Sequence, residues 1–174
     1  LLAAGAAAFN HKPKDGIAFL AEQNLLAHSG RERARSIAYF LKDSPLVDKR
    51  LLGDYISRAE NVDVLAEFID LFDFRECDVA EAMRALCEAF RLPGEAQQIA
   101  RVTETFARKY FSTKPPGIRS EDAVYVLAYS IIMLNTDLHN PQVTRRMSTA
   151  DYQRNLRGVN DGADFDQEYL ASIY

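Results

Sequence analysis

Helical periodicity runs through almost the whole chain, and signals for β-strands are nearly absent. Apolar residues recur at spacings of three and four, as in helices that bury one face. No alternating run of β-branched and aromatic residues is bounded by turn dipeptides. The pattern predicts helices over residues 3–9, 15–23, 31–42, 48–58, 62–71, 78–91, 95–111, 120–134, 148–157 and 166–174. We therefore expect an all-α fold.

The expected helices are short, and polar connections without a linker or an internal repeat join them. Such helices are marginally stable alone and need tertiary packing. Their number favours a superhelical or orthogonal array over a four-helix bundle. We expect a single domain over residues 1–174. Because the chain starts without Met and stops at Tyr174 inside a helical pattern, we expect it to be excised from a longer protein.

The charge of the chain argues against several classes of partner. The net charge is -4, and no run of Lys and Arg extends beyond pairs such as Arg145-Arg146. Nucleic acid is not an expected partner, because phosphate neutralisation needs a clustered basic face. Stable membrane binding by charge alone is disfavoured for the same reason. Residues 1–9 are apolar but too short to span a bilayer, so no transmembrane segment is expected.

Metal, cofactor and disulfide chemistry are not indicated. Cys77 and Cys87 are too far apart for a C-x-x-C site and are expected to be reduced thiols. The acidic stretch 160–166 has its glycine at the wrong offset for a Ca²⁺ loop. A phosphate-binding loop and a dinucleotide fingerprint are both missing. We expect no metal and no cofactor.

Glu95 is the first candidate functional residue. The helical pattern before it ends at Arg91, and Pro93-Gly94 breaks it. Glu95 is therefore expected at a loop tip, within the first turn of the next helix, where free amides favour a negative charge. A carboxylate on such a tip could compete with a phosphate for Mg²⁺ or for a lysine. The alternative is that Glu95 only stabilises the helix.

The segment 124–134 is apolar nearly all round and carries two stripes. One stripe is expected to be core and consists of Val124, Leu127, Ala128, Ile131 and Leu134. The other contains hydroxyl-bearing aromatics and methionine, residue types favoured at protein interfaces, and consists of Tyr125, Tyr129, Ile132 and Met133. The residues alone leave open whether the second stripe is interface or core.

A polar run over residues 135–141 follows this helix, and Asn140-Pro141 ends it as a turn. We expect this run to be a loop. His139 has no nearby Ser or Cys with a plausible base arrangement. It is expected to make hydrogen bonds rather than to act as a catalyst or metal ligand.

Four segments of the chain resemble the motifs of one family, the Sec7 domain. They are Phe9-Asn10-His11-Lys12-Pro13-Lys14-Asp15-Gly16-Ile17, the stretch from Phe90 to Gln97, the stretch from Tyr125 to Pro141, and Asn155-Leu156-Arg157-Gly158-Val159-Asn160-Asp161-Gly162. They occur in the family's order and cover nearly the whole chain. The resemblance implies a right-handed superhelix of helices and guanine-nucleotide exchange on Arf-family small GTPases, bound to GDP or free of nucleotide.

The resemblance also implies roles for individual residues. Glu95 matches the glutamic finger, which displaces Mg²⁺, repels the β-phosphate of GDP and engages the phosphate-loop lysine of the GTPase. The residues implied to bind the GTPase are Arg91, Gln97, Asp122, Tyr125, Tyr129, Ile132, Met133, Asn135 and Asn140. The alternative is a catalytically silent scaffold that binds Arf proteins. A helical-repeat adaptor for peptides would need repeats, which the sequence lacks.

Four positions resemble the pattern of the large Golgi-type members that brefeldin A inhibits, namely Tyr129, Ser130, Asp137 and Met147. Small plasma-membrane members usually carry Phe-Ala, Ser and Pro at these positions. Bacterial effectors with Sec7 domains remain an alternative. The Golgi-type resemblance implies a cytoplasmic protein that reaches Golgi-type membranes through regions outside this chain. It also implies brefeldin A as an interfacial inhibitor.

Overall fold

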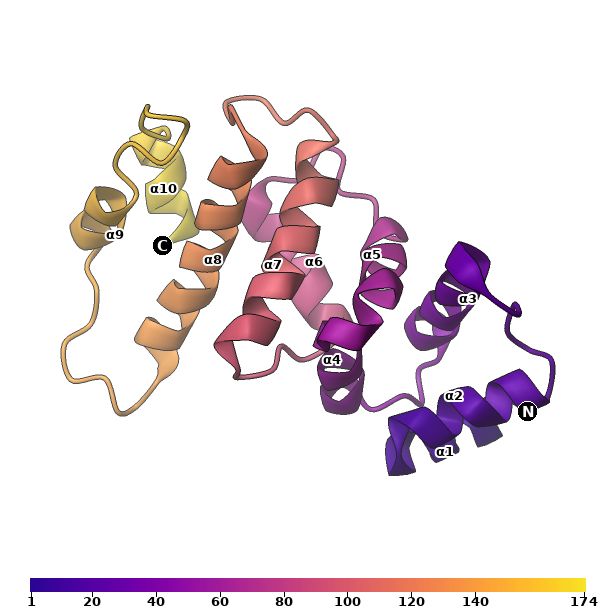
Figure 1. Ribbon diagram of the computed structural model, residues 1–174. Helices are drawn as coiled ribbons and strands as arrows, with labels where there is room; N and C mark the ends of the chain where they lie inside the picture. The colour runs from indigo at the N-terminus through magenta and orange to yellow at the C-terminus, as the bar shows by residue number, and fades with distance from the viewer. The chain divides into compact units, whose positions relative to one another are not determined.

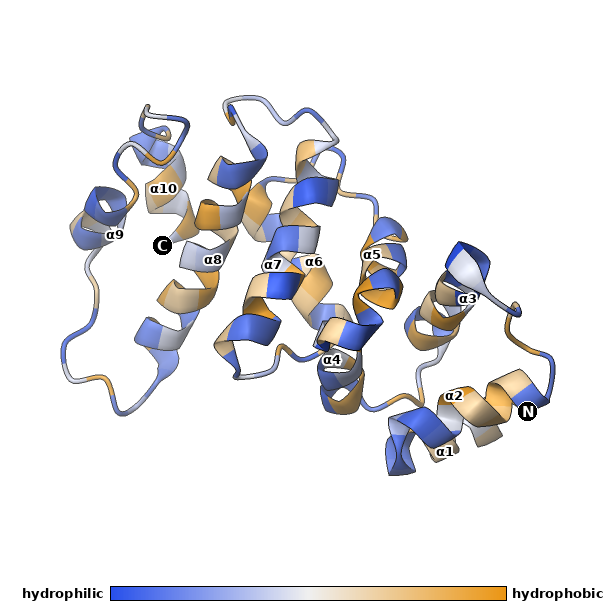
Figure 2. Ribbon diagram, in the orientation of Figure 1, coloured by the Kyte–Doolittle hydropathy of each residue, from blue (hydrophilic) through white to orange (hydrophobic).

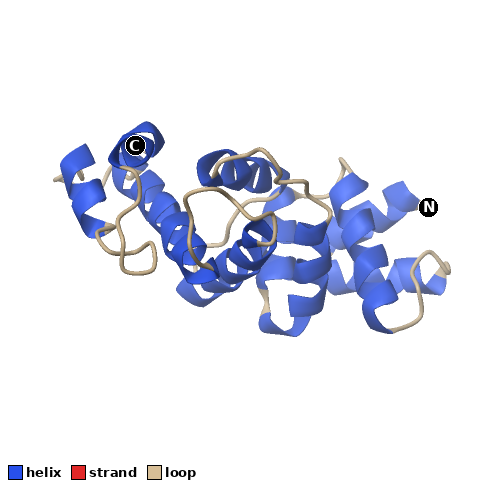
Figure 3. Cartoon of the chain, turned by 90° about the horizontal axis from the view of Figure 1, so that it is seen from above, coloured by secondary structure: helices blue, strands red, loops and turns tan.

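The computed structural model describes residues 1–174 and contains ten α-helices and one 3₁₀ helix (Figure 1). Only helices and loops are present, apart from an isolated bridge between Asn160 and Ala163 (Figure 3). The predicted all-α class is confirmed. The elements are α1 (Leu2–His11), α2 (Pro13–Glu22), α3 (Gly30–Asp43), α4 (Lys49–Ser57), η1 (Ala59–Asn61), α5 (Val62–Asp70), α6 (Val79–Ala89), α7 (Ala96–Phe111), α8 (Glu121–His139), α9 (Thr149–Asn155) and α10 (Gln167–Ile173).

Most helix ends lie within two residues of the expected positions, and side-chain caps mark several of the helix starts in the sequence. The Asp48 carboxylate accepts the backbone N–H groups of Arg50 and Leu51 at 2.9 and 3.0 Å. Ser148 and Asp151 form a reciprocal capping box at the start of α9. The 3₁₀ helix η1 was not expected, and α8 is longer than expected.

The residues fall into two compact units. The first contains Leu1–Asp73 and Arg84–Thr105, and the second contains Phe74–Met83 and Phe106–Tyr174. The Glu95 loop belongs to the first unit, and helix α8 belongs to the second.

In the first unit, α1 and α2 pack closely on each other. A single extended residue, Lys12, joins them, and Pro13 opens α2, where its missing N–H costs nothing. Gly16 lies against the backbone of Phe9, and a Cβ atom on Gly16 would be 2.5 Å from the Phe9 Cα atom. Phe9 and Leu20 are completely buried between the helices and their neighbours. Glycine is thus required at position 16 for the close approach of the two helices.

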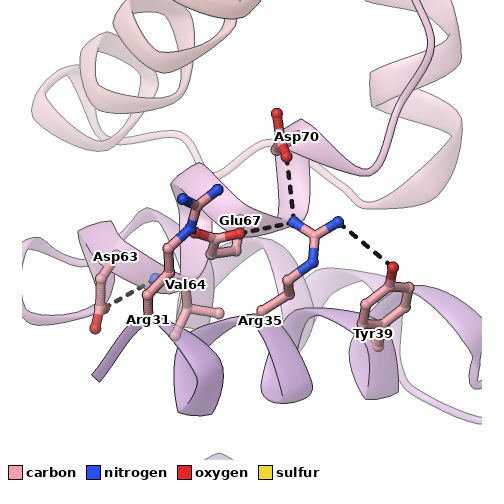
Figure 4. Close-up of polar contacts among 7 residues, drawn as sticks. All are labelled: Arg31, Arg35, Tyr39, Asp63, Val64, Glu67 and Asp70. Carbon is pink, nitrogen blue, oxygen red and sulfur yellow. Dashed lines mark hydrogen bonds and ion pairs between the residues drawn. The ribbon is translucent and has the colours of Figure 1, made fainter. Parts of the chain in front are cut away.

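Helices α3 and α5 of the same unit are joined by ion pairs around a largely buried carboxylate (Figure 4). Glu67 accepts the Arg31 Nε group at 2.6 Å and an Arg35 guanidinium nitrogen at 2.9 Å. Arg35 also contacts Asp70 at 3.2 Å and lies over the Tyr39 ring. Because the two guanidinium groups satisfy the carboxylate, its burial at 8% exposure is tolerated.

The second unit is built around aromatic and aliphatic side chains of α7 and α8. The Phe106 ring meets Phe74 edge-on at 5.3 Å and stacks on Tyr110 at 5.7 Å. Leu127 is completely buried. Figure 2 shows helix α8 hydrophobic in its central turns and hydrophilic at its ends. No helix combines the length and hydropathy that a membrane span needs.

Candidate functional site

Glu95 lies at the end of the loop that connects α6 to α7. Helix α6 ends at Ala89 and α7 begins at Ala96, so residues 90–95 form this loop, the Glu95 loop. The Glu95 side chain is exposed, and its carbonyl oxygen accepts the N–H of Ile99 at 3.0 Å. Glu95 therefore holds the capping position just before the helix. We expected Glu95 within the first turn of the helix, but it lies one residue before α7 begins.

The loop is buried at its beginning and exposed at its end. Phe90 is completely buried and meets the ring of Phe68 edge-on at 5.8 Å. Gly94 and Glu95 are exposed, and the Glu95 carboxylate makes no hydrogen bond or ion pair within the protein. Gly94 has no positive φ, so the backbone freedom expected of it is not used. A free carboxylate thus extends from a fixed base.

Helix α8 separates its two apolar stripes as the spacing predicts. Ser120 caps the helix by accepting the N–H of Ala123 at 3.0 Å. The expected core stripe is buried, apart from Ile131, which is half-buried. In the second stripe Tyr125, Tyr129 and Ile132 are half-buried and Met133 is 57% exposed. The second stripe is therefore partly accessible rather than core.

A cavity of about 410 Å³ opens beside the accessible stripe, and we call it the α8 groove. Its walls come from α8, the following segment and α9. It is lined by Tyr125, Val126, Tyr129, Ser130, Met133, Met147, Tyr152, Asn155 and Leu156. The structure thus brings Met147 to the same cavity as three residues of the stripe. Of the stripe, only Ile132 does not line it.

Ser130 uses its hydroxyl within the protein, which the sequence did not indicate. Its Oγ donates to the Leu127 carbonyl at 2.6 Å and lies 2.9 Å from the Tyr152 hydroxyl. Because a serine has one hydroxyl proton, Tyr152 donates to Ser130. Burial raises the pKa of Tyr152, so its hydroxyl keeps the proton at neutral pH. Ser130 consequently has no free hydroxyl proton to donate to a ligand.

Residues 135–139 of the polar run are helical, so the expected loop is wrong there, whereas the expected turn at Asn140-Pro141 is present. Helix α8 continues to His139, and the Asn140 N–H donates to the Thr136 carbonyl at 2.9 Å. The side chain of Asn140 then accepts the N–H of Gln142 at 2.9 Å, which forms the turn at Pro141. Polar residues here reflect an exposed helix end rather than a break in the helix.

Asp137 acts on the α8 groove through the backbone of Met147. The Asp137 carboxylate accepts the Met147 N–H at 2.7 Å, although Asp137 itself does not line the cavity. The Tyr174 hydroxyl donates to the Met147 carbonyl at 2.5 Å, and the Arg146 guanidinium donates to the Asp137 carbonyl. These bonds hold Met147 as a wall of the cavity. Of the four residues of the brefeldin A pattern, Asp137 alone does not line the cavity and contributes to it through Met147.

The remaining residues implied to bind a GTPase lie outside the α8 groove. Arg91 and Gln97 are exposed at the Glu95 loop and the start of α7. Asp122 and Asn135 are exposed on α8, and Asn140 is half-buried at its end. Sequence reasoning missed the groove-lining residues Val126, Tyr152, Asn155 and Leu156. A signal existed for the last two, because they begin the fourth motif.

A second cavity, of about 460 Å³, contains none of the predicted site residues. Tyr110 and Tyr169 line it, and both hydroxyl groups bond to the backbone. Tyr110 donates to the Cys77 carbonyl at 2.8 Å, and Tyr169 accepts the Val79 N–H at 3.2 Å. Burial raises the pKa of Tyr169 to about 12. These side chains support the fold of the second unit.

The fold and the site define a helical domain with an exposed loop carboxylate and an accessible apolar stripe. The family model of the Sec7 domain matches residues 1–174, and the chain belongs to this family. It is 46% identical to brefeldin A-inhibited guanine nucleotide-exchange protein 2 of Arabidopsis thaliana over 98% of its own length and 9% of that protein. It is 40% identical to the Golgi-specific brefeldin A-resistance guanine nucleotide exchange factor 1 homolog of Caenorhabditis elegans, over 100% of the chain and 9% of that protein.

Solved structures agree with this assignment. The structure of ARF1-GDP bound to a Sec7 domain complexed with brefeldin A has a TM-score of 0.90 and 43% identity, over 99% of this chain and 87% of that one. The crystal structure of the Sec7p catalytic domain has a TM-score of 0.89 and 34% identity, over 99% of this chain and 93% of that one. The chain spans about a tenth of the curated relatives described above.

Proposed function

We propose that this chain is a guanine-nucleotide exchange domain that promotes GDP release from Arf-family GTPases. The observation that carries the proposal is Glu95, an exposed and unpaired carboxylate at the end of a loop with a buried base. By resemblance to the Sec7 motifs Glu95 corresponds to the finger residue, and the match of the Sec7 family model to the full chain supports this proposal. A Sec7 domain bound to ARF1-GDP is among the similar structures, which supports the choice of GTPase.

The proposed exchange is a shift of population rather than covalent chemistry. The domain binds the nucleotide-free GTPase more tightly than the GDP form with its Mg²⁺. Apolar contacts with the α8 groove offset the lost Mg²⁺ and phosphate contacts. Glu95 enters the nucleotide site, displaces Mg²⁺ and repels the β-phosphate, and repulsion is strong where water is excluded. The GTPase then binds the GTP that replaces the GDP.

Release of a fluorescent GDP analogue from a soluble Arf-family GTPase tests this function directly. We expect the domain to accelerate release in proportion to its concentration until the GTPase is saturated. A GTPase from another family serves as the control and should show no acceleration. A catalytically silent scaffold would bind the Arf protein without accelerating release, and that result would contradict the proposal.

The accessible stripe of α8 is proposed as the surface that binds the GTPase. Met133→Ala should weaken binding to the GTPase by about 1–3 kcal/mol, as truncation of a central interface residue does. The fold should change little, because Met133 is 57% exposed in the free domain. Calorimetric titration of the GTPase with the wild-type domain and with Met133→Ala measures the change in affinity.

Leu134 provides the matched control for this prediction. It is the next residue of the same helix but belongs to the buried stripe, with 3% exposure. Leu134→Ala should lower the free energy of unfolding by roughly 2–5 kcal/mol, and its folded fraction should bind normally. If Met133→Ala loses stability instead of affinity, the second stripe is part of the core.

We further propose that brefeldin A inhibits the domain by binding beside the α8 groove. The names of the two relatives differ on this point, since one is called inhibited and the other refers to resistance. The Tyr129 hydroxyl makes no hydrogen bond within the protein and is free for a ligand. Tyr129→Phe should raise the inhibitory concentration by roughly 5- to 150-fold, the cost of one lost buried hydrogen bond.

Exchange by the wild type and by Tyr129→Phe, measured over a series of brefeldin A concentrations, gives the change in inhibitory concentration. Ser130→Ala is the comparison variant. That substitution leaves the buried Tyr152 hydroxyl without its acceptor, so the melting temperature should fall. Tyr129→Phe should leave the melting temperature unchanged. Equal insensitivity of the wild type and Tyr129→Phe to the drug would remove the Golgi-type assignment while leaving exchange intact.

We propose a cytoplasmic location, peripheral on Golgi-type membranes, for the protein that carries this domain. The support is the similarity to relatives whose names refer to the Golgi and to brefeldin A. Recruitment is assigned to regions outside this chain. Imaging of the full-length protein before and after brefeldin A treatment tests the location, and a diffuse signal throughout would contradict it.

A further inference from the structure

One face of helix α4 contacts the beginning of the Glu95 loop. Lys49 and Gly53 are four residues apart and therefore lie on the same face of the helix. The Arg91 N–H donates to the Lys49 carbonyl at 3.0 Å. The Lys49 ammonium donates to the Glu88 carbonyl, at the end of α6, at 2.8 Å. The chain is thus bonded to α4 on entering the loop.

The same face continues to the other side of the loop. Ser57 follows Gly53 by four residues, and its carbonyl accepts the Arg101 guanidinium of α7 at 3.0 Å. Asp54 accepts the Gln98 side-chain amide at 3.4 Å. Helix α4 therefore bonds to the segments on both sides of Glu95. Between these contacts, the exposed end of the loop has no other support from side-chain hydrogen bonds.

Gly53 is the point of closest approach between α4 and the loop. A Cβ atom at this position would lie 1.9 Å from the Arg91 carbonyl oxygen and 3.1 Å from the Phe90 ring. Two non-hydrogen atoms that are not bonded to each other cannot approach to 1.9 Å. The Arg91 carbonyl oxygen belongs to the backbone and cannot rotate away as a side chain can. Gly53 lies inside a helix and has no positive φ, so glycine is needed here for space alone.

We propose that Gly53 is a positioning residue for exchange, because its missing side chain lets Arg91 lie against α4 and so fixes where Glu95 is presented. The inference rests on the proposed role of Glu95 in GDP release. Any side chain at position 53 moves the base of the loop away from α4. Glu95 follows Arg91 by four residues and moves with it. The α8 groove, which binds the GTPase in the proposed function, is unchanged.

Gly53→Ala tests the inference by separating the rate of release from binding. The maximal rate of GDP release at saturating domain should fall roughly 10- to 100-fold, as it does when a reacting group is misplaced by about 1 Å. The domain concentration that gives half of the maximal rate should change less than the maximal rate does, because the α8 groove is unaffected. A loss of affinity with an unchanged maximal rate would overturn the inference.

Gly16→Ala is the matched control, because it introduces a similar backbone clash in another helix of the same unit. Its Cβ would lie 2.5 Å from the Phe9 Cα, and it touches no residue of the Glu95 loop. Both variants should lose stability, but only Gly53→Ala should lose maximal rate per folded molecule. Equal losses of rate in both variants would show that Gly53 has only a general structural role.

Hydrogen exchange at the Arg91 amide provides a readout that does not depend on activity. This amide is bonded to the Lys49 carbonyl, so it should be protected in the wild type and in Gly16→Ala. Protection should be lost in Gly53→Ala, and retained protection would overturn the inference. If Gly53→Ala does not fold, Lys49→Met replaces it as the test, because this variant removes only the ammonium bond to the Glu88 carbonyl. It should lower the maximal rate of GDP release and the protection of the Arg91 amide, both to a smaller degree.

The outcomes separate this inference from the proposed function. If the wild-type domain fails to release GDP, or Glu95 proves dispensable, the proposed function fails and the inference fails with it. If the wild type is active and Glu95 is required, but Gly53→Ala releases GDP at the wild-type maximal rate, only the positioning role is refuted.

Discussion

Replacing Glu95 by lysine should abolish the acceleration of GDP release and leave the fold intact. The residue is exposed at the end of a loop, so the free energy of unfolding should change by less than about 1 kcal/mol. The new ammonium group attracts the phosphates that the carboxylate repels. A long-lived complex with the GDP-bound GTPase should therefore accumulate instead of dissociating to the nucleotide-free form.

Fluorescent GDP release and size-exclusion chromatography with GDP present measure the two effects. Glu22→Lys is a suitable control, because it produces the same change in net charge at another exposed glutamate. It should exchange at the wild-type rate. Near wild-type release by Glu95→Lys would reject Glu95 as the finger, whatever the similarity of the surrounding residues.

Replacing Phe90 by alanine should strongly destabilise the domain. The ring is completely buried and contacts Phe68 edge-on at 5.8 Å. Removing it should lower the free energy of unfolding by roughly 3–5 kcal/mol, through lost burial and the cavity left behind. Domains are commonly stable by only about 5–15 kcal/mol, so much of the stability would be lost.

Urea denaturation followed by circular dichroism measures this loss. Leu46→Ala is the control, since Leu46 is 60% exposed and its truncation should change stability by no more than about 0.5 kcal/mol. A loss below about 1 kcal/mol for Phe90→Ala would mean that the base of the Glu95 loop rearranges easily. Such a base would not hold Glu95 in one place.

Local signals explain why most helices were predictable from the sequence. Asp48, Ser120 and Ser148 each cap a helix as their residue types favour. The Pro93-Gly94 pair lies in the loop between α6 and α7, as this type of dipeptide favours. The two stripes of α8 followed from helical spacing, which also decides which side chains share a face.

The features that the sequence did not predict depend on interactions that local sequence patterns do not reveal. Residues 135–139 were assigned to a loop because they are polar, but they contain neither Gly nor Pro, and α8 ends only before Asn140-Pro141. The pairing of Ser130 with Tyr152 joins residues 22 positions apart. The contact of Gly53 with Arg91 likewise depends on tertiary packing. No periodicity in the sequence predicts such pairs.

The hydrogen bond between Asp137 and Met147 makes the chemistry of these two positions interdependent. The bond uses the backbone N–H of residue 147 rather than its side chain, so many side chains can replace methionine without releasing the segment. Proline is the exception, because it has no N–H and would leave the Asp137 carboxylate without this donor. Other residues at position 147 therefore change the wall of the α8 groove while keeping this bond, whereas proline changes the wall and removes the bond together.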